Sequence, residues 1–323
     1  MMPAPMVRGQ ETAGISVPTL GFVFDSGAGG LRRILGIPGA ALLGDPLESS
    51  IPAIAATISP RQDYALVTGR DRQLRLIRFQ NATAGAEISL PAPERIVLSP
   101  MGSAAALYYS TTGMLHLLTG LPDAVGAERK IDLSRLGRVS PSIALSDDGQ
   151  LILLGNTDDS SSVLLLGADG GQTRLSVSGP VAALAFRDRS DDAVIAMQDG
   201  SIALIRALSQ SPAYEILADA TAGLAEAIAV EFSADAARVY AVSSTGAILG
   251  LGLAERTPVR LSCSCRPSGL HRQNGGGGFR LNSLAEGPVF LLDTATRPER
   301  VLFVPAPMPE TAMAAENITR SVQ

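Results

Sequence analysis

Tryptophan is absent from this sequence, lysine occurs once, and histidine and cysteine occur twice each. Acidic residues outnumber basic ones, 31 to 26, which gives a formal net charge of −5. A nucleic-acid-binding protein needs a basic stripe that neutralises phosphates, and this sequence contains none. No apolar run approaches the ~18 residues that a membrane-spanning helix requires. We therefore expect neither a nucleic-acid partner nor a membrane span.

The scarcity of histidine also limits enzymatic chemistry, because histidine is the most frequent general base. His116 lies in the apolar segment Met114–Leu118, which reads as a strand interior, and is expected to be structural. His271 lies in a loop and is the better candidate for a functional group. Most aspartates stand at turns, where an aspartate caps its own backbone. The composition therefore favours a binding protein over an enzyme.

The two ends of the chain differ from its middle. Residues 1–14 form an extension without the basic and apolar segments of a secretory signal peptide. We therefore expect a cytoplasmic protein, or an exported one if a leader has been removed. The regular pattern runs over residues 15–305. Residues 306–323 contain proline, alanine and glutamate without a period and are expected to be disordered.

One phrase recurs along the regular region, an apolar strand that leads into a tight turn. Its clearest form is Ser146-Asp147-Asp148-Gly149, with apolar segments on both sides. Five such turns lie about 40 to 47 residues apart. They are anchored at Ser59, Ser99, Ser146, Arg187 and Ser233. A period of roughly 40–50 residues is typical of β-propeller blades with four strands each.

Each period contains four segments of strand type. Short apolar runs alternate with turns of Gly, Pro, Asp and Ser, and a fourth, more polar segment closes the unit. We expect the polar segment to be the outermost strand, since one of its edges faces solvent. Complete units are expected at residues 51–90, 94–136, 141–178, 181–218 and 227–262.

The recurring phrase and its period resemble WD40-type and YVTN-type β-propellers over most of the chain. The resemblance implies an all-β fold, a ring of four-stranded antiparallel blades. Residues 15–305 accommodate seven such blades, and six or eight are the alternatives. The chain departs from true WD40 repeats because it has no tryptophan and no Gly-His pair. Since propellers carry many unrelated functions, no activity follows from the fold.

The two terminal units have three clear strands each. In the N-terminal unit these are residues 20–25, 31–35 and 40–43, and in the C-terminal unit 279–284, 288–293 and 301–304. A further strand near Ile15 is expected to complete the last unit. N- and C-terminal strands would then close the ring, which removes exposed strand edges.

Residues 263–278 break the repeat and contain the rarest residue types of the chain. Cys263 and Cys265 are two residues apart, so on a strand both thiols point to one face, with His271 brought round by a Pro/Gly turn. Cysteine and histidine are zinc ligands, but four ligands are usual and no fourth is evident. A Cys-x-Cys disulfide is a second alternative. The favoured interpretation is two small apolar side chains near a blade edge.

The same segment contains Arg266 and four consecutive glycines, Gly275, Gly276, Gly277 and Gly278. Four glycines in a row have maximal backbone freedom. They predict either a mobile loop or a place that another backbone approaches closely. If the protein has a binding site, we expect it in this segment, with Arg266 and the glycines among the binding residues.

We therefore predict an all-β, seven-bladed β-propeller that serves as a monomeric, non-enzymatic binding or protein-interaction platform. Its partner is a protein or a small molecule, and no cofactor is implied. Rigid rings with variable loops at both faces suit this role. The alternative is a metal-dependent hydrolase or lyase that acts on a small molecule at the channel mouth. A structural domain of a larger envelope assembly is a third interpretation.

Overall fold

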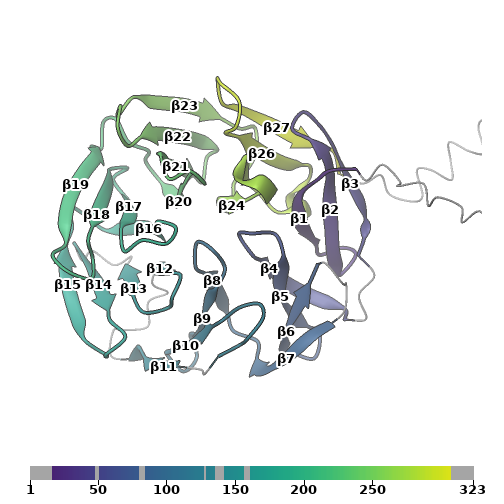
Figure 1. The fold of residues 1–323 in the computed structure, drawn as a ribbon. Helices are drawn as coiled ribbons and strands as arrows, with labels where there is room; N and C mark the ends of the chain where they lie inside the picture. Colours follow the sequence, from purple (N-terminus) through teal and green to yellow (C-terminus); the bar gives the residue numbers. More distant parts are fainter. Residues whose placement is uncertain are drawn as a thin grey trace, which may run out of the picture.

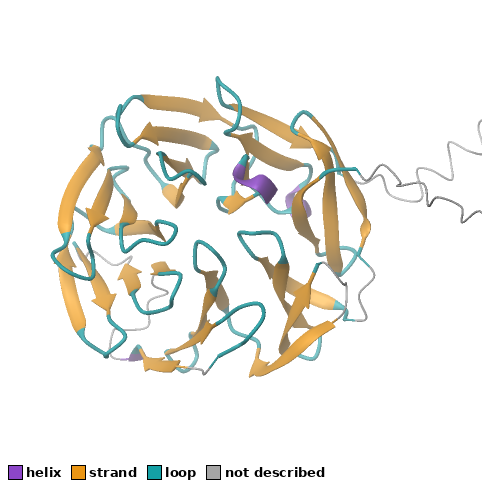
Figure 2. Ribbon diagram, in the orientation of Figure 1, coloured by secondary structure: helices purple, strands orange, loops and turns teal. Residues whose placement is uncertain are grey.

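Seven antiparallel β-sheets stand around a central axis in the computed structural model (Figure 1). The structure describes residues 17–47, 51–79, 84–126, 129–134, 142–155 and 161–306. Within these ranges, six sheets have four strands and one has three, which confirms the predicted seven-bladed propeller. The helices of the described ranges are short turns between the strands (Figure 2). None of the described helices is long and apolar enough to cross a membrane.

The strands follow the chain blade by blade, from the axis outward in each four-stranded blade (Figure 1). The first three blades contain β1 (Thr19–Asp25), β2 (Gly30–Ile37) and β3 (Ala40–Pro46); β4 (Ala53–Ile58), β5 (Tyr64–Gly69), β6 (Gln73–Arg78) and β7 (Ala84–Pro91); and β8 (Arg95–Leu98), β9 (Ala104–Tyr109), β10 (Met114–Thr119) and β11 (Arg129–Asp132). The fourth and fifth contain β12 (Ser142–Leu145), β13 (Ile152–Gly155), β14 (Ser162–Leu166) and β15 (Gln172–Ser176); and β16 (Val181–Phe186), β17 (Ala193–Met197), β18 (Ile202–Arg206) and β19 (Ala213–Ala218). The last two contain β20 (Ala227–Phe232), β21 (Arg238–Ser243), β22 (Ala247–Gly252) and β23 (Pro258–Ser262); and β24 (His271–Arg272), η2 (Asn274–Gly276), β25 (Gly278–Arg280), η3 (Leu284–Glu286), β26 (Val289–Asp293) and β27 (Arg300–Val304).

Burial along the strands follows their position in the blade. The second strands β5 and β17 are buried along their whole length, because neighbouring blades cover both of their faces. The outermost strands β15 and β23 are mostly exposed. The polar fourth segment of these units is therefore the outer strand, as the sequence predicts.

In two of the five recurring turns, a serine pairs with an aspartate two residues later. The Ser146 hydroxyl donates to Asp148 Oδ1 (2.6 Å) and accepts the N–H of Leu151 (2.9 Å). Ser233 donates to Asp235 in the same way (2.6 Å). This network joins the end of one strand to the start of the next, which explains why these two aspartates stand at turns.

Apolar side chains from facing sheets hold each blade against the next. Between the fifth and sixth blades, for example, Leu204 packs in one cluster with Val230 and Phe232. The first and last blades meet in the same way, with Val23 and Val289 in a shared cluster. Complete burial of one such side chain contributes roughly 1.5–3 kcal/mol. Packing between blades therefore holds the first blade to the last.

The last blade differs from the three strands that the sequence predicts for it. Its innermost strand is β24, which pairs with β25, so all four strands come from the C-terminal part of the chain. A two-residue strand has no periodic pattern, which is why the sequence predicts a loop there. Ile15, the extension 1–14 and the chain after residue 306 lie outside the described residues.

Candidate functional site: the central channel

Cys263 and Cys265 are joined by a disulfide at the start of the segment that breaks the repeat. The structure therefore has the disulfide alternative, and both cysteines also pack beside an apolar cluster, as the interpretation of two small apolar side chains expected. Sequence spacing alone could not decide between the two states. A thiolate is the form of cysteine that binds metal, and neither sulfur is a thiolate here. Within the described ranges, no three His, Cys, Asp or Glu side chains form a group that could hold a metal ion.

A surface cavity of about 670 Å³ lies beside the disulfide, between the sixth and last blades. Arg266, one of the predicted binding residues, is the charged residue of its lining. The described lining has no side-chain nitrogen or oxygen that is buried without a hydrogen-bond partner. This cavity therefore contains no polar group that a ligand is needed to satisfy.

The four glycines do not form one uniform loop. Gly275 and Gly276 belong to η2 and have positive φ angles of 72° and 68°. A Cβ atom at Gly276 would collide with the side chain of Ala234, and one at Gly278 would collide with the carbonyl oxygen of Leu292. Close approach therefore explains the glycines at 276 and 278, whereas Gly275 faces open space.

The segment that breaks the repeat reaches the ring axis at β24 (Figure 1). Both residues of β24 line a channel cavity of about 220 Å³. The walls of this channel cavity come from the second, third, sixth and last blades. Its ionisable lining residues are Glu231, His271, Arg272 and Arg280. The structure thus separates His271 from the two cysteines, which line the cavity at the disulfide.

Arg272 connects three other blades to the last one. Its guanidinium pairs with Asp188 (2.7 Å) and Glu231 (3.6 Å), and Nη2 donates to the carbonyl oxygen of Phe232 (3.2 Å). Its own carbonyl oxygen accepts a hydrogen bond from Gln62 Nε2 (2.7 Å). These contacts reach the second, fifth and sixth blades. Arg272 is therefore a structural crosslink at the ring axis.

Glu231 shares the Arg272 guanidinium with Asp188, so two carboxylates compete for one cation. Burial raises the pKa of Glu231 from 4.5 to about 7; the charge of Arg272 opposes this shift, and that of Asp188 adds to it. The folded state therefore holds this proton more tightly than the unfolded state does. It follows that the stability contributed by the protonated carboxyl is complete below about pH 4.5 and is lost as the pH rises through about 7.

Glu231→Gln is expected to raise the unfolding temperature above about pH 7 and to change it little near pH 4.5, because glutamine resembles the protonated carboxyl. Thermal unfolding followed by circular dichroism across this pH range tests the expectation. The matched control is Glu255→Gln at an exposed position, which should leave the pH dependence of the unfolding temperature unchanged. A lower unfolding temperature of Glu231→Gln at about pH 8 would show instead that the ionised pair with Arg272 dominates.

Arg280 is a buried cation without an acidic partner among the described residues. It lies opposite His271 in the β24–β25 pair and is 8% exposed. Nη1 donates to the carbonyl oxygen of Asn282, and Nε is buried with no partner in the described structure. Burial lowers the pKa of the guanidinium to about 10, so the group stays charged at neutral pH. A buried charge without a counter-charge is unfavourable by several kcal/mol, so this position favours an anion.

His271 places a neutral polar ring next to this cation. Desolvation by the surrounding strands and the charge of Arg280 lower the pKa of His271, although its ring is open to the channel, so the imidazole is uncharged at neutral pH. The residue is exposed to the channel cavity, and a neutral imidazole donates one hydrogen bond and accepts another. Together, the two residues present a positive charge and a hydrogen-bonding ring to the same space.

Sequence reasoning did not single out Glu231, Arg272 or Arg280. A signal was present at Arg280, which stands between Phe279 and Leu281 in an apolar segment. A charged residue in such a place is rarely fully buried unless it is paired. Whether a partner exists depends on the strands beside it in space, which no local pattern reveals.

No protein-family model matches this sequence, and no curated protein is significantly similar to it. Similarity is found among solved structures. A functionally unknown protein from Desulfotomaculum acetoxidans DSM 771 matches with a TM-score of 0.61 at 13% identity, over 89% of this chain and 95% of that one. The Cps50 (Swd1) β-propeller domain of Myceliophteria thermophila matches with 0.55 at 14% identity, over 85% and 96%. The RRP9 WD40 repeats match with 0.53 at 13% identity, over 80% and 82%.

Matches at such low sequence identity show similarity of fold and nothing about function. The comparisons agree with the seven radial sheets and with the turn phrase that led to a WD40-like expectation. They identify no sequence family. In fold, the chain is a seven-bladed β-propeller that resembles WD40 propellers and a bacterial propeller.

Proposed function

We propose that this propeller is a non-enzymatic binding platform and that its channel cavity binds a small oxyanion, a carboxylate or a phosphate. The architecture supports a platform because the blades are packed face to face around the ring. A ligand at the axis would therefore meet walls that are already in place, as in most small-molecule sites. A volume of about 220 Å³ suits a small anion rather than a polymer.

The unpaired guanidinium of Arg280 is the observation that carries this proposal. Its Nε–H is buried without an acceptor among the described residues, and Arg280 is one of the residues that line the channel cavity. An oxyanion at this position would supply the missing acceptor and the missing negative charge together. Hydrogen bonds to a charged group contribute about 1.5–3 kcal/mol each.

The neighbouring groups support an anion rather than a cation. Arg272 adds a second positive charge to the lining, although its guanidinium is already engaged by Asp188 and Glu231. The raised pKa of Glu231 keeps part of the negative charge out of the cavity near neutral pH. His271 is neutral and offers a hydrogen bond without adding charge.

The test is isothermal titration calorimetry of the purified protein with phosphate, sulfate, acetate and citrate, each as its sodium salt at constant ionic strength. At least one of these anions is expected to bind. The variant Arg280→Gln should weaken its binding by about tenfold or more, since one charged hydrogen bond is lost. Arg280→Lys keeps the charge, so its affinity for the anion should fall by less.

The matched control is Arg266→Gln, which removes one arginine charge at the other cavity of the same segment. The affinity of this variant for the anion should equal that of the unmodified chain. Circular dichroism and the unfolding temperature establish that each variant is folded. If none of the four anions binds, or if a folded Arg280→Gln binds as tightly as Arg266→Gln, the oxyanion site is ruled out.

A further inference from the structure

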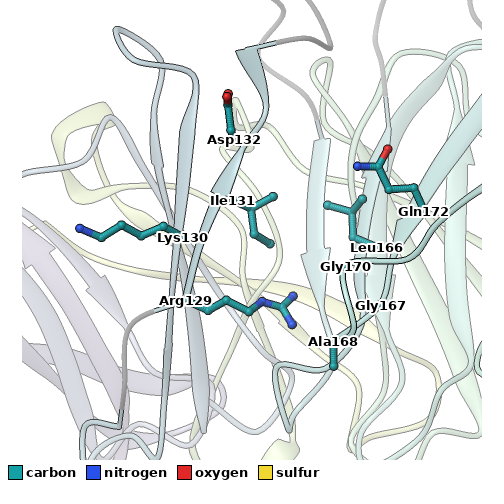
Figure 3. A pocket seen from close by; sticks show the side chains of 9 residues that line it. All are labelled: Arg129, Lys130, Ile131, Asp132, Leu166, Gly167, Ala168, Gly170 and Gln172. Atoms are coloured by element: carbon teal, nitrogen blue, oxygen red, sulfur yellow. The ribbon is translucent and has the colours of Figure 1, made fainter.

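A second cavity lies between the third and fourth blades, beside their outer strands β11 and β15 (Figure 1). Figure 3 shows its lining side chains. Its volume is about 290 Å³. The outer strand β11 of the third blade forms one wall, and β14, β15 and the turn between them form the other. We call it the inter-blade cavity. None of its lining residues belongs to the channel cavity, so its chemistry is independent of the proposed oxyanion site.

Strand alternation directs Arg129 toward the fourth blade. Arg129 opens β11, opposite Leu117, and Ile131 follows two residues later on the same face. Ile131 packs against the apolar cluster that contains Leu166 of the fourth blade. Figure 3 shows the guanidinium of Arg129 extending toward the β14–β15 turn, while Lys130 points away from it.

The guanidinium of Arg129 is buried in part and has no partner there. Nε and Nη2 are both inaccessible to solvent and make no hydrogen bond within the described structure. Asp132 is the acidic residue of the described lining, and its carboxylate accepts a hydrogen bond from the N–H of Ser134 (2.8 Å). Two buried nitrogen donors without acceptors are unfavourable, and an anion that reached them would relieve that penalty.

Nε–H and one Nη2–H point in parallel from the side of a guanidinium, which is the arrangement that a carboxylate accepts with both oxygens. Beside this fork, Ile131 and Leu166 face each other across the inter-blade cavity (Figure 3). The turn opposite leaves room, because Gly170 has no neighbour near the place where a Cβ would stand. The cavity thus combines a two-pronged donor, an apolar surface and space.

We propose that the inter-blade cavity binds a carboxylate carried on a short aliphatic chain. The carboxylate pairs with Nε and Nη2 of Arg129, and the methylene groups pack between Ile131 and Leu166. The exposed amide of Gln172 lines the same space and adds a neutral hydrogen-bonding group. This chemistry belongs both to a free dicarboxylate and to a glutamate side chain of another protein.

Binding is tested by calorimetry with two probes, glutarate and the capped tripeptide acetyl-Ala-Glu-Ala-amide. Glutarate binding alone assigns the site to a free small molecule, and binding of the peptide as well assigns it to a protein-borne glutamate. Arg129→Gln is expected to lower the affinity for the probe that binds by about tenfold or more. Arg174→Gln removes the same charge from the exposed strand β15 and should leave the affinity unchanged. Arg280→Gln should also leave it unchanged, which separates this site from the channel cavity.

A second measurement distinguishes a ligand site from a structural arginine. Without ligand, Arg129→Met is expected to raise the unfolding temperature, because it replaces two buried, unsatisfied guanidinium nitrogens by an apolar chain of similar length. A lower unfolding temperature would make Arg129 structural and overturn the proposal. Failure of both probes to bind, or equal affinity in Arg129→Gln and Arg174→Gln, would overturn it as well.

Discussion

Replacing Glu299 by alanine is expected to lower the free energy of unfolding by about 3–5 kcal/mol. The Glu299 side chain is only 2% exposed and pairs with Arg238 (3.1 Å) and Arg297 (3.2 Å). It also accepts a hydrogen bond from the hydroxyl of Tyr240 (3.4 Å). Arg238 and Tyr240 belong to β21 of the sixth blade, whereas Glu299 directly precedes β27 of the last blade. The substitution removes the carboxylate and leaves Arg238, itself 16% exposed, beside an empty space between two blades.

Chemical denaturation, read by circular dichroism, measures this loss. Glu255→Ala is the matched control, because Glu255 is exposed and should change the free energy of unfolding by no more than about 0.5 kcal/mol. A loss below about 1 kcal/mol for Glu299→Ala would mean that removal of the pair is offset by relief of the desolvation of its charges.

Gly278→Ala is expected to lower the free energy of unfolding by about 1–3 kcal/mol, because the added methyl group has no room. Gly278 opens β25 and pairs with Asp293 of β26. Its Cβ would collide with the backbone carbonyl of Leu292, and a backbone atom cannot move aside as a flexible side chain can. The substitution must therefore disturb the pairing of β25 with β26 in the last blade.

The neighbouring glycine provides the control. Gly277 has a φ of −76°, and the nearest atom to its Cβ position is the Ala295 Cβ at 3.6 Å, an ordinary contact. Gly277→Ala is therefore expected to be neutral or to stabilise the fold by about 0.4–1 kcal/mol through the unfolded chain. Equal effects of the two substitutions, measured by denaturation, would contradict close approach and favour a uniformly mobile loop.

The architecture could be predicted because its information is local and repeated. Each turn is built within a few residues, as Ser146 and Asp148 show, and each strand pairs with its neighbour in sequence. Repetition of a local pattern then specifies a ring of similar blades. The same reasoning predicted the polar outer strands, since edge position alone determines their exposure. It did not reveal β24, whose two residues are too few to show a period.

The candidate sites depend on contacts between segments that are distant in sequence. Arg272 meets Gln62 and Asp188 only because the ring brings the inner strands of separate blades to one axis. Arg280 is unpaired because no acidic side chain of the described structure reaches it there. The covalent state of Cys263 and the room beside Gly278 are likewise decided by the folded backbone. Local pattern determines which segments become strands and turns, whereas the solvation and charge of a side chain depend on its neighbours in space, and only the closed ring supplies those neighbours.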